Sequence, residues 1–229
     1  FIFEELDSSF ISASIITIIF GTLFLLSNLE NDKKLNLQHA FLLTSLSWLS
    51  VAVFGSLPFI FSELNLSVTD SFFESMSGIT TTGSTIITDL NSAPKALLIW
   101  RAILQWLGGI GIIVMAITLM PIMNVGGMQL LKVSTSDASE KILPKTKEIA
   151  VRIIIIYFVL TFLCALLYNI FGMKIFDSLT HSMTTIATGG FSNYNDSIGH
   201  FNNFKIEITS MIFIILGSIP FIAYIKYLS

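Results

Sequence analysis

Residues 149–171 read IAVRIIIIYFVLTFLCALLYNIF and contain a single charged side chain, that of Arg152. A helix needs about 20 consecutive, mostly apolar residues to cross the hydrocarbon core of a bilayer. This stretch meets that requirement and predicts a membrane-spanning helix. Four other stretches have the same character and predict four further spans: residues 9–27, 38–61, 96–120 and 204–228.

The overall composition agrees with a membrane protein. The chain has 229 residues, of which 53% are hydrophobic and 12% are charged, whereas soluble domains average about 25% charged residues. The formal net charge is −3 and no run of basic residues is present, so the sequence gives no indication of a nucleic-acid partner. Together these observations predict an all-α polytopic membrane protein with about five transmembrane helices.

The positive charges predict the orientation of the spans, because cytoplasmic loops carry an excess of lysine and arginine. When residue 9 enters from the outside, eight basic residues fall on the inner side: Lys33, Lys34, Lys132, Lys141, Lys145, Lys147, Arg152 and Lys226. Four fall on the outer side: Lys95, Arg101, Lys174 and Lys205. This orientation places two polar stretches between the spans, residues 66–92 and 173–200, on the outer face.

The two polar stretches are related in sequence. DSFFESMSGI at 70–79 aligns with DSLTHSMTTI at 177–186, and the shared letters are D-S, S-M and I at the same spacing. TTTGS at 80–84 follows the first copy and ATGGF at 187–191 follows the second, so the first copy has one residue more before its glycine. Since each copy lies between two predicted spans, the chain contains two repeats of the form span, short helix, loop and span.

Each copy begins with residues typical of a helix start. Ser71 and Glu74 fit a capping box, and Asp177 and Ser178 are favourable N-cap residues. Capping is the favoured role of Glu74 and Asp177, although these two and Asp70 can also attract cations to an outer vestibule. Because these starts lie in polar stretches between spans on the outer face, they predict two re-entrant pore helices that enter from the outside.

The backbone after each pore helix suits an ion path. Each helix is expected to end inside the membrane, where its C-terminal end carries about half a negative charge and favours a nearby cation. Backbone without helical hydrogen bonds survives at membrane depth only inside protein or along a water-filled cavity. Carbonyl oxygens facing such a cavity can replace the water shell of an ion.

Other interpretations of these residues exist. Clusters of Gly, Ser and Thr in membrane proteins are often helix-packing surfaces or outer turns, but their repetition at equivalent places favours an ion path. His181 is expected to pack or cap, and Arg101 to pair with an acid or to reach the membrane surface. The GGIG run at 108–111 lies inside a span without a preceding strand, so it predicts close helix packing and not a nucleotide-binding loop.

With these motifs in view, the chain resembles the TrkH branch of the Trk/Ktr/HKT potassium transporters. The motifs that carry the resemblance run in family order: FFE at 72–74, SGITTTG at 77–83, WR at 100–101, QWLGGIGII at 105–113, GGMQL at 126–130, HSM at 181–183 and IATGGFS at 186–192. The resemblance implies four repeats in a full-length chain, of which this fragment covers two. The expected division is a preliminary transmembrane helix (1–37), a first pore repeat (38–123), a cytoplasmic loop (124–148) and a truncated second pore repeat (149–229).

The resemblance also implies the site. Gly83 and Gly189 correspond to filter glycines of the family, and glycine rather than serine at the first of them favours potassium. The expected mechanism is dehydration of potassium at the backbone carbonyls of Thr81, Thr82, Gly83, Ala187, Thr188 and Gly189. An enzyme is not expected, because a membrane enzyme needs a cluster of His, Asp, Glu, Ser or Lys side chains at membrane depth, and the sequence shows none.

The implied function is potassium uptake across the bacterial inner membrane as part of a Trk system. The implied partners are a second copy of the chain in a homodimer and a cytoplasmic TrkA-type nucleotide-binding ring, for which the lysines of residues 124–148 offer a contact surface. The alternatives are a sodium-dependent Ktr-type transporter or another monovalent-cation transporter. The span at 9–27 and the GGMQL motif favour the Trk type, and the sequence leaves open whether protons or sodium are coupled in symport.

Overall fold

The computed structural model describes residues 8–27, 37–123 and 138–228 of the chain. Every regular element in these ranges is helical, which confirms the predicted all-α fold. The elements are α1 (Ser8–Ser27), α2 (Leu37–Ile60), α3 (Val68–Ile79), α4 (Lys95–Met123), α6 (Ala138–Ile170), α7 (Ile175–Ile186), the 3-10 helix η1 (Ser197–Phe201), α8 (Phe204–Ser218) and α9 (Phe221–Leu228). The predicted loop 124–148 is helical from residue 138 on, as the start of α6, and its first part, with the GGMQL motif, lies outside the described residues.

Four of the helices are long and apolar enough to cross a membrane, namely α1, α2, α4 and α6. The fifth predicted span, 204–228, is wrong as a single helix, because α8 and α9 meet at an angle of 86°. Pro220 explains the break, since proline lacks an N–H and disfavours helical backbone at the residue before it. That residue, Ile219, is extended with a ψ of 132°. The described residues therefore hold four candidate spans, or five when the bent pair counts as one.

Apolar side chains cover the outward faces of these helices. Phe24 of α1, Phe162 of α6 and Ile215 of α8 are all more than 60% exposed. A surface of this kind is unfavourable in water and is the expected surface of a helix in lipid. Polar side chains are buried instead, among them Glu74 and Arg101. The candidate functional groups therefore lie in the interior of the bundle.

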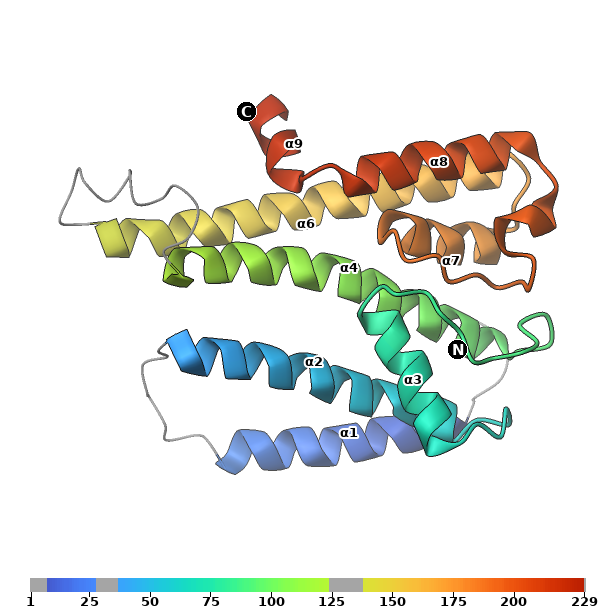
Figure 1. Ribbon diagram of the computed structural model, residues 1–229, viewed down its shortest axis with the longest axis horizontal. Coiled ribbons are helices and arrows are strands. Elements are labelled where there is room, and N and C mark those ends of the chain that lie inside the picture. Colours follow the sequence, from blue (N-terminus) through green and yellow to red (C-terminus); the bar gives the residue numbers. More distant parts are fainter. Residues whose placement is uncertain (1–7, 28–36, 124–137, 229) are drawn as a thin grey trace.

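Figure 1 shows how α3 and α7 differ from the spans. Both are 12 residues long, too short to cross a bilayer. Each begins at the same end of the bundle, stops part-way along it, and is followed by a loop that returns to that end (Figure 1). The two polar stretches are therefore re-entrant segments on one side of the molecule, as the sequence predicted.

Two glycines allow the spans to approach the ends of the short helices. A Cβ atom at Gly108 of α4 would overlap the carbonyl oxygen of Ile79, the last residue of α3. A Cβ atom at Gly217 of α8 would lie 2.6 Å from the carbonyl oxygen of Ile186, the last residue of α7. No side chain fits at either place. The predicted packing role of the GGIG run is confirmed at Gly108, and the second repeat uses the same contact.

Candidate functional site in the two re-entrant loops

The start of α3 is fixed by Ser67. Its hydroxyl oxygen accepts a hydrogen bond from the backbone N–H of Asp70 at 3.1 Å, and its O–H donates to the Asp70 carboxylate at 2.7 Å. The carboxylate also lies in the first turn, where the helix dipole favours a negative charge. The predicted capping box of Ser71 and Glu74 is wrong, because Ser67 is the N-cap residue and the other two side chains are completely buried.

The start of α7 has no side-chain cap. Lys174 holds the N-cap position without a capping hydrogen bond, so the predicted capping role of Asp177 and Ser178 is wrong. Asp177 instead accepts hydrogen bonds from the Asn193 amide at 2.9 Å and the Tyr194 hydroxyl at 3.0 Å. Burial, together with the negative charge of Asp177, raises the pKa of Tyr194 to about 12, so this hydroxyl stays a donor at neutral pH. Asp177 thus ties the outer loop back to α7.

Both short helices end in the same hydrogen-bonded motif. After α3, the N–H of Thr81 donates to the carbonyl of Gly78 and the N–H of Thr82 donates to that of Ser77, both at 2.9 Å. This is the Schellman motif, in which loop N–H groups satisfy the last carbonyls of a helix. The same two bonds recur after α7, from Thr188 to Thr185 and from Gly189 to Thr184, both at 3.0 Å.

The two copies match at a constant offset. The helices α3 and α7 begin 107 residues apart and end 107 residues apart. The same offset relates the left-handed residues of the loops, since Thr81 has a φ of 56° and Thr188 of 53°, while Gly83 has a φ of 80° and Gly190 of 83°. The structural counterpart of Gly83 is therefore Gly190, and Gly189 occupies the position before it. The additional residue before the first glycine is not an insertion.

The left-handed threonines indicate backbone strain. Helix ends of this type normally carry glycine at the left-handed position, because a side chain there costs roughly 1–2 kcal/mol. A β-branched residue such as Thr81 or Thr188 is especially unusual in this conformation. Strain of this kind persists where the surroundings hold it, and it clusters at functional sites. Its occurrence at two equivalent positions makes the two loops the candidate functional site.

The carbonyl oxygens of the two loops accept no hydrogen bond within the part of the chain that the structure describes. Among the described residues, no hydrogen-bond donor reaches the carbonyl oxygen of Thr81, Thr82, Gly83, Ala187, Thr188, Gly189 or Gly190. Backbone carbonyls inside proteins nearly always have a partner, and at membrane depth the remaining partners are water and ions. Each set of oxygens also lies at the C-terminal end of a helix, where the helix dipole adds negative potential.

The fold brings the two loops into contact. A Cβ atom at Gly83 would overlap the carbonyl oxygen of Gly189, so the loop of the first repeat packs directly on the backbone of the second. Ala187 lies against α4, since a Cβ atom at Gly109 would be 3.0 Å from the Cβ atom of Ala187. The residues that the sequence predicted as one site therefore lie together, although they come from two repeats.

A buried ion pair supports the first loop from behind. Glu74 and Arg101 are 0% and 1% exposed, and Nε of Arg101 lies 2.7 Å from a carboxylate oxygen of Glu74. The carboxylate also accepts hydrogen bonds from the Thr85 hydroxyl and the Ile86 N–H, both at 2.9 Å. The prediction that Arg101 pairs with an acid is confirmed, and the pair holds the chain directly after the predicted filter residues.

Arg101 also reaches the second repeat. Its Nη1 donates to the carbonyl of Ser192 at 2.8 Å, and its guanidinium carbon lies 4.1 Å from the centre of the Phe191 ring. His181 of α7 supports the same loop, because its Nε2 lies 3.1 Å from the Ser192 hydroxyl. The expected packing role of His181 is confirmed, and one arginine connects the outer parts of both loops.

The outer ends of the two loops are also joined. The Leu90 N–H donates to the side-chain oxygen of Asn195 at 2.9 Å. The side-chain amide of Asn195 donates to the carboxylate of Asp89, and its backbone N–H donates to the side-chain oxygen of Asn91, both at 3.4 Å. Asn195 therefore holds the second repeat against the first at the surface.

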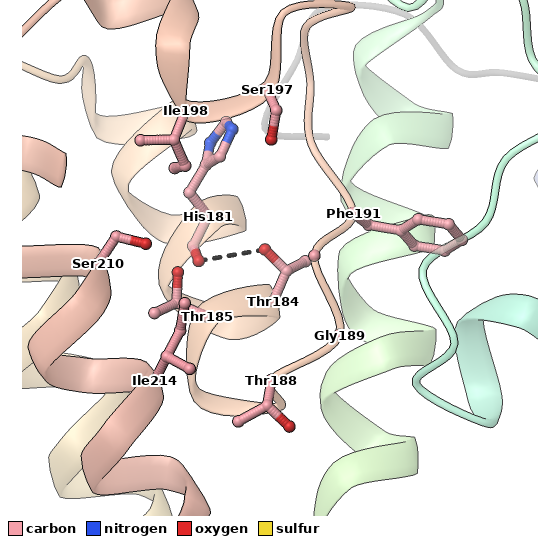
Figure 2. Close-up of a pocket in the computed structure, with 11 residues that line it drawn as sticks. His181, Thr184, Thr185, Thr188, Gly189, Phe191, Ser197, Ile198, Ser210 and Ile214 are labelled. Carbon is pink, nitrogen blue, oxygen red and sulfur yellow. Dashed lines mark hydrogen bonds between the residues drawn. The ribbon is translucent and has the colours of Figure 1, made fainter.

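A cavity of about 230 Å³ lies beside the second loop, between α7 and α8. Figure 2 shows hydroxyl groups around it, whereas the ring of Phe191 turns away from it towards α4. The hydroxyls belong to Thr184, Thr185, Thr188, Ser197 and Ser210. Thr188 and Gly189 of the predicted site line this cavity, and its polar walls make it suitable for water or a hydrated ion.

The chemistry of the loops suits a weakly bound monovalent cation. Among the residues that the structure describes, no group of three or more His, Cys, Asp or Glu side chains is placed to hold a metal ion. The buried carboxylates of the two short helices, Glu74 and Asp177, already accept hydrogen bonds from protein groups. The remaining oxygens are uncharged carbonyls and hydroxyls, which are typical of potassium filters.

These features define a class of protein: a multi-pass membrane protein in which two re-entrant short helices bring their loops together inside a bundle of spans. The family model TrkH, described as a cation transport protein, matches residues 6–229. The chain therefore belongs to the TrkH family, as its motifs predicted. The family consists of transport proteins and not enzymes, and with these apolar helices it places the chain in the bacterial inner membrane.

Curated relatives agree with this assignment. The chain is 43% identical over 189 residues to the Trk system potassium uptake protein TrkI of Halomonas elongata, covering 82% of this chain and 38% of the relative. It is 41% identical over 212 residues to the Trk system potassium uptake protein TrkH of Escherichia coli, covering 91% and 44%. The chain thus spans less than half of the length of these relatives.

A solved structure has the same fold. The crystal structure of the potassium transporter TrkH from Vibrio parahaemolyticus matches with a TM-score of 0.79 and 38% sequence identity. The match covers 90% of this chain and 42% of that one. The predicted helical membrane fold is therefore confirmed by comparison as well as by the helices themselves.

Sequence reasoning missed three contributors to this site. Gly190 was taken as the residue after the filter glycine, although its φ pairs it with Gly83. Gln105 was treated only as part of a motif, although it is completely buried beside the second loop. Ser192 was not singled out, although both Arg101 and His181 bind it. The 107-residue offset of the two repeats, applied across the whole loop, would have paired Gly190 with Gly83. The contacts of Gln105 and Ser192 depend on tertiary packing and have no such signal.

Proposed function

We propose that the full-length protein containing this chain takes up potassium, and that its two re-entrant loops form part of the selectivity filter. The filter segments are residues 81–83 and 187–189, as the sequence predicted, together with Gly190. The observation that carries the proposal is the pair of equivalent loops, in contact with each other, whose carbonyl oxygens have no partner among the described residues.

The proposed mechanism is dehydration without covalent chemistry. A potassium ion exchanges its water shell for the carbonyl oxygens of Thr81, Thr82 and Gly83, and for those of the second loop. The C-terminal ends of α3 and α7 add negative potential at the same place. Because the N–H groups of the loops are engaged in capping the helices, the oxygens are held ready and need little reorganisation.

Two observations favour potassium as the cargo. The carbonyl and hydroxyl oxygens of the loops carry no formal charge, whereas a site for a divalent cation usually includes carboxylates. The relatives are named as potassium uptake proteins, and the similar crystal structure is that of a potassium transporter. Among monovalent-cation transporters, the Trk type is preferred to the Ktr type because the relatives are Trk proteins.

The proposal includes a complete pore built from more than this chain. Two loops do not close a ring by themselves, so the further loops come from the remainder of the full-length protein or from another subunit. A homodimer and a cytoplasmic TrkA-type nucleotide-binding ring are the proposed assembly. The lysine-rich segment 124–148 is the proposed contact with the ring, and part of it lies outside the described residues. Removing its lysines without loss of ring binding would exclude that contact.

Rubidium uptake tests the function. The full-length parent protein is expressed in cells that lack other potassium importers, and the native protein is compared with Gly83→Ser. Since a side chain at Gly83 meets the Gly189 carbonyl, the serine is expected to abolish uptake or to shift it towards sodium. The matched control is Gly172→Ser, because Gly172 also has a positive φ, of 110°, but lies in open space outside both loops.

The outcomes separate the possibilities. Uptake by the native protein and the Gly172→Ser control, with loss in Gly83→Ser, supports the filter. A native protein that reaches the membrane and carries no rubidium contradicts the potassium assignment. Normal uptake and selectivity in Gly83→Ser would show that this loop only packs.

A further inference from the structure

Gln105 occupies an unusual place on α4. It lies four residues after Arg101, and its side chain is 0% exposed. Its Oε1 accepts a hydrogen bond from the backbone N–H of Phe191 at 3.0 Å, while Arg101 binds the carbonyl of the next residue, Ser192, at 2.8 Å. Two side chains from successive turns of the first repeat therefore hold two successive residues of the second repeat.

The Gln105 amide also lies between the two predicted filter loops. A Cβ atom at Gly189 would overlap the Gln105 side chain, so the glutamine packs on the bare backbone of that residue. A Cβ atom at Gly83 would lie 3.7 Å from Nε2 of Gln105. The amide thus touches the second loop directly and reaches the edge of the first.

A purely structural role does not account for the choice of residue. Nε2 of Gln105 has no hydrogen-bond partner among the described residues, and burying an unpaired amide N–H disfavours folding. An apolar residue of similar length, such as methionine, fills the space without that penalty. What glutamine adds is the acceptor oxygen, and this oxygen fixes the backbone of Phe191 directly after the loop of residues 187–190.

We propose that Gln105 is a positioning residue for cation selectivity, setting the second filter loop against the first through its bond to the Phe191 N–H. This inference rests on the proposed potassium function. Selectivity of a carbonyl filter depends on the size of the site or on the number and field of its carbonyl dipoles. Both depend on how the two loops are placed relative to each other, and the Gln105 side chain lies at that junction, against the second loop and beside the first.

The experiment measures uptake of rubidium and of sodium by the full-length protein in cells that lack other potassium importers. Gln105→Met removes the acceptor and keeps the length of the side chain, whereas Gln105→Glu keeps both. Gln105→Met is expected to lower the ratio of rubidium to sodium uptake at least fivefold, and Gln105→Glu to keep the ratio within threefold of the native protein. Gln105→Asn, which withdraws the acceptor by one methylene, decides the test where Gln105→Met does not reach the membrane.

The control is Thr161→Val on α6. Its hydroxyl accepts a hydrogen bond from Trp106 at 3.0 Å, so this variant also loses a partly buried hydrogen bond of α4, but one that involves neither loop. It is expected to keep the native ratio of rubidium to sodium uptake, even where the amount of protein falls.

The ratio distinguishes positioning from plain stability, because a merely structural residue lowers the uptake of both ions together. An unchanged ratio in Gln105→Met, or in Gln105→Asn where that variant decides, overturns the inference while native uptake of rubidium leaves the proposed function standing. A ratio lost equally in Gln105→Glu also overturns it, because the acceptor is then not the cause. Failure of the native protein itself to carry rubidium contradicts the proposed function and, with it, the inference.

Discussion

Arg101 and Glu74 lie 27 residues apart in sequence and form a completely buried ion pair with an N–O distance of 2.7 Å. The pair joins α4 to α3 within the first repeat. Because Arg101 also binds the carbonyl of Ser192, the same guanidinium fixes the second repeat. One almost completely buried charged group therefore connects the two loops.

Breaking this ion pair is expected to be costly. Arg101→Met leaves Glu74 as an unpaired buried charge, which destabilises a protein by about 3–5 kcal/mol. Combining Arg101→Met with Glu74→Gln is expected to recover part of that loss, since no charge then remains. Thermal unfolding of the purified full-length protein in detergent measures both variants.

The control for the ion pair is Arg152→Met. Arg152 pairs with Glu148 at 2.7 Å, but both side chains are about half or more exposed, and exposed pairs contribute at most about 1 kcal/mol. Equal effects of Arg101→Met and Arg152→Met would contradict the role assigned to the buried pair.

Replacing the left-handed threonines by glycine is expected to separate stability from selectivity. Thr81→Gly and Thr188→Gly relieve backbone strain of roughly 1–2 kcal/mol each, offset in part by the greater freedom of glycine in the unfolded chain. Each variant is expected to be as stable as the native protein or more so, and to discriminate less between rubidium and sodium. A clear loss of stability with unchanged discrimination would show that the threonines matter only for folding.

The contact between α4 and the end of α3 excludes any side chain at Gly108. Gly108→Ala is expected to destabilise the protein by about 1–3 kcal/mol, because its Cβ atom meets the Ile79 carbonyl and overpacking costs that much. Gly21→Ala of α1 is the control, since nothing lies within 4 Å of its Cβ position and alanine favours a helix. Thermal unfolding that shows the same change for both variants would refute the close contact.

Tyr194 is expected to titrate late. Tyrosine ordinarily ionises with a pKa near 10, and burial together with Asp177 raises the pKa of Tyr194 to about 12. The stability that the protonated Tyr194 hydroxyl contributes is thus fully present below pH 10. It is lost as the hydroxyl ionises between pH 10 and pH 12. An ultraviolet difference titration of the native protein and Tyr194→Phe checks this, and a difference centred near pH 10 would contradict the bond to Asp177.

The sequence predicted the class of fold because a helix that crosses a membrane needs about 20 consecutive apolar residues. A run such as 149–171 can only be a span or a buried helix, and helix α6 confirms the span. The repeat of 70–79 at 177–186 likewise predicted two re-entrant helices, because the same local pattern gives the same local structure. The break at Pro220 was missed, since the apolar character of 204–228 outweighed the one residue that cannot continue a helix.

Helix starts were the least reliable prediction, for a physical reason. The side chains at both predicted starts, Ser71 with Glu74 and Asp177 with Ser178, have the right chemistry for caps. Each carboxylate, however, binds a partner from another part of the fold. Glu74 pairs with Arg101 and Asp177 binds Asn193. A local pattern shows that two nearby residues are correctly spaced to form a cap. It does not show which distant residue binds the same carboxylate after folding.

Sequence alone therefore determined the membrane class, the two repeats and the loops that the proposed function requires, because the length of an apolar run and the repetition of a local pattern can both be read along the chain. Tertiary structure decided which glycines are equivalent, because the φ angles of Gly83 and Gly190, 80° and 83°, show that the 107-residue offset of the two repeats continues through the loops. It also decided that Arg101 and Gln105 of the first repeat hold residues 191–192 of the second. Such contacts join side chains of α4 to the backbone of a loop that lies 86 and 91 residues further along the chain, and no pattern along the chain records them.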